Sequence, residues 1–304
     1  MALRYYDRAR GIFVRDGGIP LAIVDYNRAN IFVNMGELGK AESLYRETSK
    51  IYRHAGITIN AVKADYSLAY LYFLTDRYTR ALKAFEKVYQ DFMDLGDNKS
   101  AAAALLDMAE MNIYLHQYSS SIALAEKVIP LYRKFKQPYE EGKAHYFVAQ
   151  SLSRLGDHKD AGRYLTDADK LFRSEDNRLW QGMVYYLKSQ IDLDKNRTKS
   201  AISSARKSRE FFAASGDERR SVDAELVLLE AELSSNNGGL RRAKKIKEQV
   251  HLGYQKYNLL KVIGEYYLRR GDYRAASHQF RAAIKIVEKM LLNLYPDEIR
   301  FFFT

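Results

Sequence analysis

The strongest constraint on the fold of this chain is a set of small residues that recurs every 40 positions. The set comprises Ala41, Ala81, Ser121, Ala161 and Ala201, and a second set stands twelve residues earlier each time, at Ala29, Ala69, Ala109, Ala149 and Ser189. Two small positions in fixed register let two helix backbones approach closely at one place in every repeat. The pattern therefore predicts a tandem array of helix pairs.

Turn signals between the small positions set the limits of the repeats. Gly36 stands between the helices of one pair and Gly96 between two pairs, and glycine tolerates the left-handed backbone that ends a helix. The turns predict about seven pairs, at 19–56, 57–97, 98–138, 139–177, 178–217, 218–252 and 253–290, with the period shortening from 40 to about 34 at the last. Residues 1–18 are expected to form the second helix of a truncated pair, and residues 291–304 to begin a linker or a following domain.

The segment 259–288, LLKVIGEYYLRRGDYRAASHQFRAAIKIVE, states the repeat most fully. We expect Gly264 to leave room for Ala276, and Tyr267, Phe280 and Ala283 to complete the contacts of an antiparallel helix pair. This segment resembles a tetratricopeptide repeat (TPR), and the common register extends the resemblance over nearly the whole chain. The resemblance implies an all-α fold, a right-handed superhelical solenoid of helix-turn-helix repeats.

Composition agrees with a helical array and excludes several kinds of site. The 304 residues include only 4 Pro, 17 Gly and no Cys, and the 6 His are scattered. Gly39-Lys40 is followed by Ala41, where a phosphate-binding loop needs Ser or Thr. We therefore expect no metal site, no cofactor and no catalytic residue. The lack of Cys, of a signal peptide and of an apolar run of about 18 residues predicts a cytoplasmic protein without a membrane segment.

Two registers on the first helices form the candidate ligand-binding face. Tyr26, Tyr66, Leu106, Tyr146 and Tyr186 stand three residues before the small residue, and Asn30, Tyr70, Glu110, Gln150 and Gln190 stand one residue after it. The two registers are four residues apart and therefore share one side of a helix. In a TPR stack the first helices line the concave face, where tyrosine rings can cover apolar side chains and amides can hold a peptide backbone. A protein or peptide ligand is the partner that this ladder predicts.

A packing role for these tyrosines is the alternative, since some rings would simply fill the space between neighbouring helices. The amides of Asn30, Gln150 and Gln190 indicate a solvent-exposed or ligand-binding surface more strongly than the tyrosines do, because a buried amide without a partner costs about 1 to 3 kcal/mol. Recognition of a chaperone C-terminal tail is disfavoured: Tyr26 and Ser67 stand where chaperone-binding TPR domains carry Lys and Asn.

Basic residues gather near the C-terminal end of the array. Arg241, Arg242, Lys244, Lys245 and Lys247 occupy five of seven positions. Such a patch can neutralise phosphates, so a basic solenoid that contacts nucleic acid is a second alternative function. Acidic residues are interspersed in the surrounding sequence, and for this reason we favour a solvated helix face over a nucleic-acid site.

A narrower resemblance concerns the last helix and the residues after it. The long units and the segment from Ala282 to Phe303, AAIKIVEKMLLNLYPDEIRFFF, are similar to bacterial proteins in which a TPR array precedes a CHAT domain, a caspase-like protease. The resemblance implies a regulatory or sensing array whose protease His and Cys would lie beyond Thr304. The chain itself is expected to be a non-catalytic binding scaffold. A TPR regulator of the peptide-pheromone-receptor kind is the main alternative, and an assembly scaffold without a peptide ligand is another.

Overall fold

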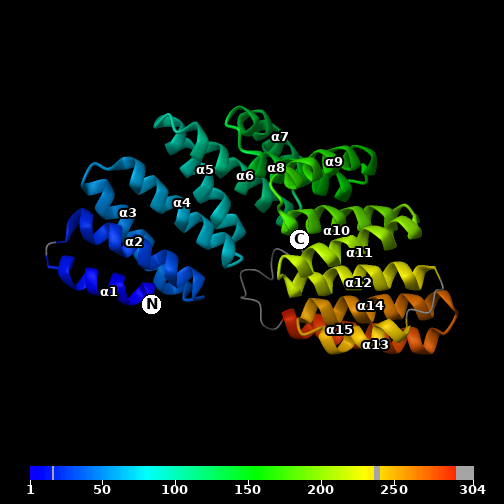
Figure 1. Ribbon diagram of the computed structural model, residues 1–304. Helices are drawn as coiled ribbons and strands as arrows, with labels where there is room; N and C mark the ends of the chain where they lie inside the picture. The colour runs from blue at the N-terminus through cyan, green and yellow to red at the C-terminus, as the bar shows by residue number, and fades with distance from the viewer. Residues whose placement is uncertain (16, 236–239, 292–304) are drawn as a thin grey trace. The chain divides into compact units, whose positions relative to one another are not determined.

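The computed structural model describes residues 1–15, 17–235 and 240–291, and every regular element among them is an α-helix (Figure 1). The helices are α1 (Ala2–Phe13), α2 (Gly18–Asn34), α3 (Leu38–His54), α4 (Thr58–Leu74), α5 (Tyr78–Asp94), α6 (Asn98–Tyr114), α7 (Tyr118–Lys134), α8 (Pro138–Arg154), α9 (His158–Ser174), α10 (Arg178–Asp194), α11 (Thr198–Ala214), α12 (Glu218–Ser234), α13 (Leu240–Gln249), α14 (Gly253–Arg269) and α15 (Tyr273–Leu291). The expected all-α array of TPR-like helix pairs is confirmed.

The array divides into two compact units, residues 1–164 and 165–304, with the boundary inside α9. We call the first helix of each pair helix A and the second helix B, so that α2, α4, α6 and α8 are helices A of the first unit. In the second unit α10, α12 and α14 are helices A. Residues 292–304, which hold most of the expected linker and CHAT-like junction, lie outside the described residues.

The 40-residue period arises because the helices and their links have a constant length. Each helix from α2 to α12 has 17 residues and is followed by three link residues up to α12. The middle link residue takes a positive φ every 20 positions, from Gly36 (φ 76°) to Gly216 (φ 77°). After α2, the amide of Glu37 donates to the carbonyl of Phe32 at 2.9 Å across this turn. This left-handed cap stops each helix at the same length, so two helices and two links make 40 residues.

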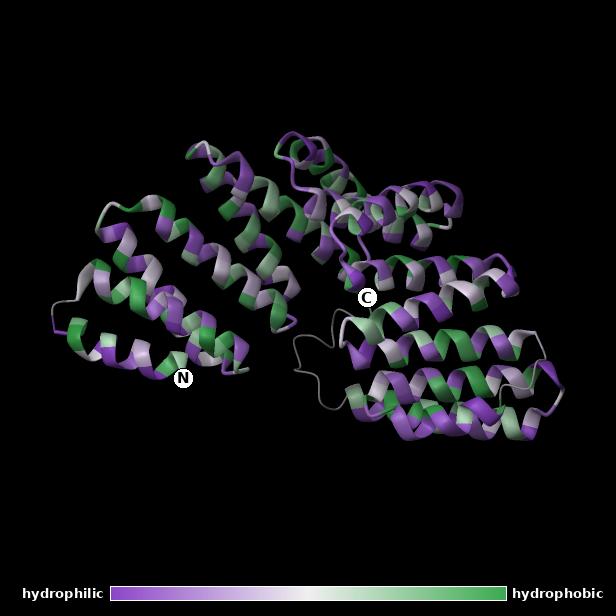
Figure 2. Cartoon of the chain, viewed as in Figure 1, coloured by the Kyte–Doolittle hydropathy of each residue, from purple (hydrophilic) through white to green (hydrophobic). Residues whose placement is uncertain are grey.

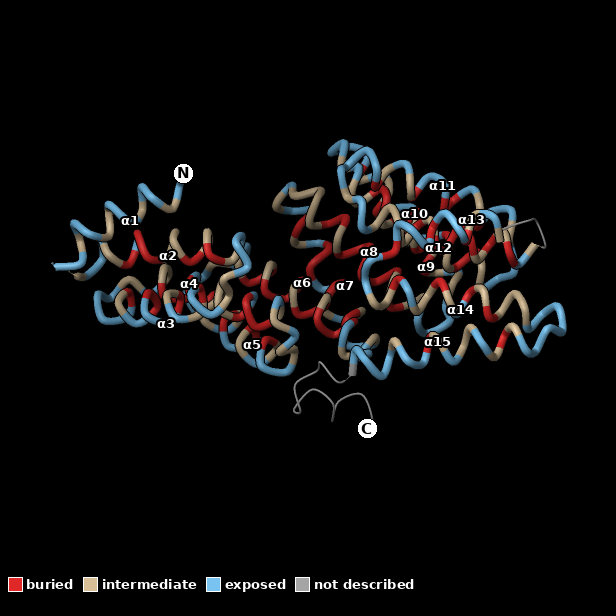
Figure 3. The backbone as a smooth tube through the Cα atoms, turned by 90° about the horizontal axis from the view of Figure 1, so that it is seen from below, coloured by how far each residue is buried: buried red, intermediate tan, exposed pale blue. Residues whose placement is uncertain are grey.

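The recurring small residues lie at the points of closest helix packing. All ten positions of the two sets are fully buried, with no exposed surface. Where Ser replaces Ala, its hydroxyl is satisfied: Ser121 accepts a hydrogen bond from Ser151 at 3.0 Å, and Ser189 donates to the carbonyl of Tyr186 at 2.6 Å. Hydrophobic and hydrophilic residues alternate along the helices (Figure 2), and buried residues recur along helices such as α6 and α8 while α1 and α15 are largely exposed or intermediate (Figure 3).

An arginine of helix B repeatedly contacts helix A of the following pair. The pairs are Arg10 with Asp25, Arg53 with Asp65, Arg133 with Glu141, Arg173 with the Tyr185 hydroxyl, and Arg209 with Glu225. Contacts of this kind contribute little stability at a surface, typically below about 1 kcal/mol. At these five places the contacts define the orientation of a helix B relative to the following helix A.

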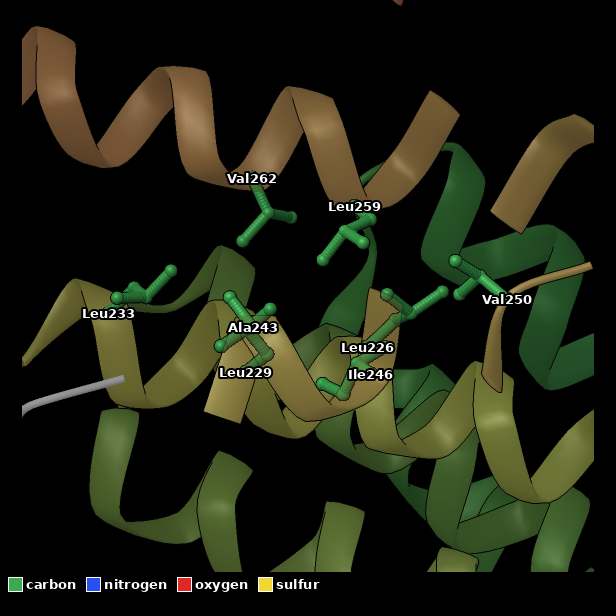
Figure 4. Close-up of a cluster of buried hydrophobic side chains, with 8 residues drawn as sticks. All are labelled: Leu226, Leu229, Leu233, Ala243, Ile246, Val250, Leu259 and Val262. Carbon is green, nitrogen blue, oxygen red and sulfur yellow. The ribbon is translucent and has the colours of Figure 1, made fainter. Parts of the chain in front are cut away.

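The pair α12–α13 is irregular, because α13 has only 10 residues. Its apolar stripe nevertheless inserts between α12 and α14: Ala243, Ile246 and Val250 pack with the leucines of α12 and with Leu259 and Val262 of α14 (Figure 4). Ile246 is fully buried. A thin stripe is therefore sufficient to hold this short helix in the array.

Gly264 in α14 has a different neighbour from the one expected. A side chain at this position would meet the ring of Phe280, whose Cε1 lies 2.7 Å from where a Cβ would stand. The ring of Phe280, and not Ala276, occupies the space that the glycine leaves. The same arrangement recurs at Gly182, where a Cβ would stand 2.7 Å from the ring of Phe212.

Replacing Gly264 with Ala should lower the free energy of unfolding by about 1 to 3 kcal/mol, because the methyl group would displace the Phe280 ring from a close-packed site. The matched control is Gly162→Ala in α9, where no atom lies within 4 Å of the point that a Cβ would occupy. The control should be neutral or stabilising by up to about 1 kcal/mol. Urea midpoints of the two variants measure the difference, and equal midpoints would contradict the packing described.

Candidate functional site

The tyrosines of the first register tie successive helices A together in the first unit. The hydroxyl of Tyr26 on α2 lies 2.9 Å from that of Ser67 on α4, and the hydroxyl of Tyr66 on α4 donates to the carboxylate of Asp107 on α6. Both contacts span 41 residues of sequence. The two rings also pack on the helix B of their own pair, Tyr66 against Phe85 with ring centroids 5.2 Å apart. These tyrosines therefore have a packing role, and part of each side chain remains accessible.

Asp107 is the centre of a polar group on this face. Asp107 is half-buried, and its loss of contact with water raises its pKa, while the positive charge of Lys143 on α8 and the hydrogen bond from Tyr66 oppose the rise. Burial and the negative charge of Asp107 raise the pKa values of Tyr66, Tyr70 and Tyr132. Helices α4, α6, α7 and α8 thus place phenols, a carboxylate and an ammonium group near one another.

The second register is partly exposed, and one of its members is held from within its own pair. Tyr45 on α3 donates its hydroxyl to the side-chain oxygen of Asn30 at 2.6 Å, and burial raises the pKa of Tyr45 to about 12. Tyr70 is 41% exposed, whereas Glu110 and Gln150 are half-buried. Glu110 adds a negative charge beside Tyr70 and contributes to the raised pKa of that phenol.

Tyr146 is a correction to the predicted ligand-binding set. Tyr146 is only 2% exposed, and its ring centroid lies 6.2 Å from the ring centroid of Phe147. A ligand has no access to it in this arrangement. Leu106, the apolar member of the same register, is buried in the same way. The structure brings Tyr66, Tyr70 and Glu110 near one another on α4 and α6.

An aromatic cluster extends this site toward the turns, and sequence reasoning missed it. Phe73 packs against Tyr70, Tyr78 and Tyr114 with ring centroids 5.4 to 5.9 Å apart, and Tyr78 stacks on Tyr114 at 5.5 Å with an interplanar angle of 6°. Tyr114 is 52% exposed. The signal was available: Phe73 and Tyr114 stand four and five residues after the small residue of their helices, one turn beyond the second register.

In the second unit the second register continues through residues that the sequence ladder left out. Gln190 and Tyr186 on α10 are half-buried, and the next members are Glu230 on α12 and Glu265 on α14. Burial raises the pKa of Glu230, and the negative charge of Glu265 raises it further. Glu265 lies 3.7 Å from the ammonium group of Lys261. Glu230 keeps the 40-residue spacing from Gln190, whereas Glu265 follows Glu230 by only 35 residues.

The predicted basic patch separates into one paired residue and four exposed ones. Arg242 on α13 bonds to both Glu225 and Glu232 of α12. Arg241, Lys244, Lys245 and Lys247 are exposed. Within the patch, the acidic residues of α12 therefore pair with Arg242 and leave the side chains of the other four residues exposed.

No group of three His, Cys, Asp or Glu suited to a metal ion occurs among the described residues. Within the same residues, no helix is long and apolar enough to cross a membrane.

The comparisons with known proteins rest on structure alone. No family model matches the sequence, and no curated protein is similar to it. The fold is similar to RapI in its apo form, with a TM-score of 0.71 and 13% identity over 90% of this chain and 99% of RapI. It is also similar to a Rap protein in complex with competence and sporulation factor, with a TM-score of 0.59 and 13% identity over 89% of this chain and 98% of that one.

A third similar structure is a STAND signal transduction ATPase with a tetratricopeptide repeat sensor, from Pyrococcus horikoshii. The TM-score is 0.72, and the identity is 15% over 95% of this chain. This chain spans only 45% of the length of that protein. The three likenesses establish the TPR-type helical-repeat fold.

Replacing Asp107 with Asn should raise stability at neutral pH. The folded protein holds the Asp107 proton more tightly than the unfolded chain does, so stability falls as pH rises from the ordinary Asp range through the raised pKa. Asn cannot ionise, yet it can still accept the Tyr66 hydrogen bond. We expect a higher urea midpoint for the variant at pH 7 and converging midpoints as the pH falls below about 3.9, the ordinary Asp value. A lower midpoint for the variant at pH 7 would contradict the described burial.

Proposed function

We propose that the helix-A face of the first unit is a non-catalytic binding site for an extended peptide or protein segment. The observation that carries this is the polar and aromatic group on α4, α6 and α8: the exposed ring of Tyr70, the half-buried carboxylates of Asp107 and Glu110, and the positive charge of Lys143. Aromatic rings beside polar groups are what an extended backbone and its side chains require.

The similar structures support this proposal. One of them is a Rap protein in complex with competence and sporulation factor, and another carries a TPR sensor. A role like that of a peptide-pheromone receptor therefore gains weight as the alternative interpretation of the same site. Both interpretations use helix-A side chains, and they differ in what the array regulates.

The charges of the site give the ligand a preferred sign. Asp107 and Glu110 outnumber Lys143 around Tyr70, and the ring of Tyr70 offers an additional surface to a cation. A ligand segment with a Lys, an Arg or a free amino terminus would offset the electrostatic cost of the partly desolvated Asp107. We therefore propose a positively charged segment.

The link to a CHAT protease stays a prediction. Its main support is the junction from Ala282 to Phe303, and residues 292–303 of that junction lie outside the described residues. The reading frame beyond Thr304 tests it directly: a downstream domain with protease His and Cys would support the link, and a different domain would overturn it.

Peptides selected from a displayed random library on the immobilised protein provide the test of the binding site. Replacing Tyr70 with Ala should weaken the selected peptides about tenfold, the effect expected for an aromatic anchor worth about 1 to 2 kcal/mol. The matched control is Tyr273→Ala, which removes a tyrosine on α15 that is 71% exposed. The control should leave affinity unchanged.

Replacing Glu110 with Gln separates the charge preference from the site itself. Selected peptides that carry Lys or Arg should weaken on this variant, and neutral peptides should not. Failure to select any peptide, or equal binding to the wild type and the Tyr70 variant, would contradict the site. Enrichment of acidic peptides would contradict only the preferred sign.

A further inference from the structure

Positive charge in the second unit is concentrated on its helices B. Helix α13 carries five Lys or Arg and one Glu, and α11 carries four Lys or Arg and one Glu. Helix α12, which packs against both, carries two Arg and five acidic residues. The two charge signs are therefore separated between neighbouring helices.

The acidic side chains of α12 hold the inner arginines of α11 and α13. Glu225 accepts hydrogen bonds from Arg209 of α11 at 3.0 Å and from Arg242 of α13. Glu232 accepts from Arg242 at 2.8 Å and lies 3.8 Å from Arg206 of α11. This network joins the three helices and fixes α11 and α13 relative to each other.

Most other cations of these helices are exposed, and so is Arg206 at the edge of the network. We define the basic face as Lys199 and Arg206 of α11 with Arg241, Lys244, Lys245 and Lys247 of α13. Positions 241, 244 and 245 lie on one side of α13. The exposed glutamates, Glu210 and Glu248, stand near the C-terminal ends of their helices. Among the acidic residues of α12, Glu225 and Glu232 engage the inner arginines.

We propose that the basic face binds the phosphate backbone of double-stranded nucleic acid without reading its sequence. Binding of this kind rests on Lys and Arg side chains that displace counterions from phosphates. The exposed cations of α11 and α13 stand on helices that α12 already holds through Glu225 and Glu232, so the charges are presented without folding of a further segment.

Other anionic partners fit this surface less well. The exposed large hydrophobic residues of the described chain all lie outside α11 and α13, so an anionic membrane would find no apolar residue to insert. Protein interfaces are depleted in Lys and need buried anchors. Single strands bind through base stacking on aromatic rings. Helix α13 has no aromatic residue, and on α11 Phe212 is buried while Phe211 stacks on Tyr185.

Fluorescence anisotropy of a labelled DNA duplex of about 20 base pairs tests the proposal, at salt concentrations between about 50 and 200 mM. About four to five phosphate contacts predict a slope of log K against log salt of about −4. Replacing Lys244 and Lys245 with Glu should reduce the magnitude of the slope by about 2 and lower the affinity at low salt about tenfold or more. Circular dichroism should show unchanged folding, since both residues are exposed.

The matched control changes the same charge elsewhere. Lys83 and Lys87 are exposed on α5, whose basic and acidic residues are balanced, and replacing both with Glu should leave the slope near the wild-type value. Lack of duplex binding at low salt would overturn the proposal, as would equal losses in the two double variants. Binding to phosphatidylserine vesicles without binding to the duplex would also overturn it. If the Lys244 and Lys245 variant does not fold, the double change to Gln replaces it.

Discussion

The contact between two helix backbones at fully buried small residues is the constraint on which the rest of this structure depends. Ala29 and Ala41, and the four pairs that follow them at 40-residue spacing, are all Ala or Ser and all fully buried. This contact fixes the distance and the rotation of every helix about its own axis. The side of each helix that faces its partner is then settled, and the remaining sides are left for neighbouring pairs or for ligands.

Because each helix A has a similar rotation about its own axis, the candidate functional residues fall at the same positions relative to the small residue. A residue one position after the small residue points in the same direction in each helix A, whatever its chemistry. The first unit uses the register for aromatic and acidic groups, and the second unit places Glu230 and Glu265 there. The chemistry of the face thus varies along the array while the backbone remains regular.

Charged side chains also recur at corresponding places, namely at the contacts between one helix pair and the next. Arginines of helix B reach the next helix A in five places, and in α11 to α13 these contacts become a network around Glu225 and Glu232. Arginine suits this role because its planar group can bond to two carboxylates at once. Lysines are left at the outer positions, where a strongly hydrated ammonium group remains in water.

The sequence by itself determined the helix limits, the 40-residue period and the registers, because these depend on local signals: turn residues that take a positive φ, and small residues at fixed spacing. It could not determine which register members reach a surface. Tyr146 and Tyr70 are both tyrosines at register positions, yet one is buried and the other exposed. Likewise Asn30 is bonded to Tyr45, and Arg242 is paired while Lys244 is exposed. These outcomes depend on side chains from helices packed alongside, many residues away in the chain, and only the tertiary structure brings those side chains together.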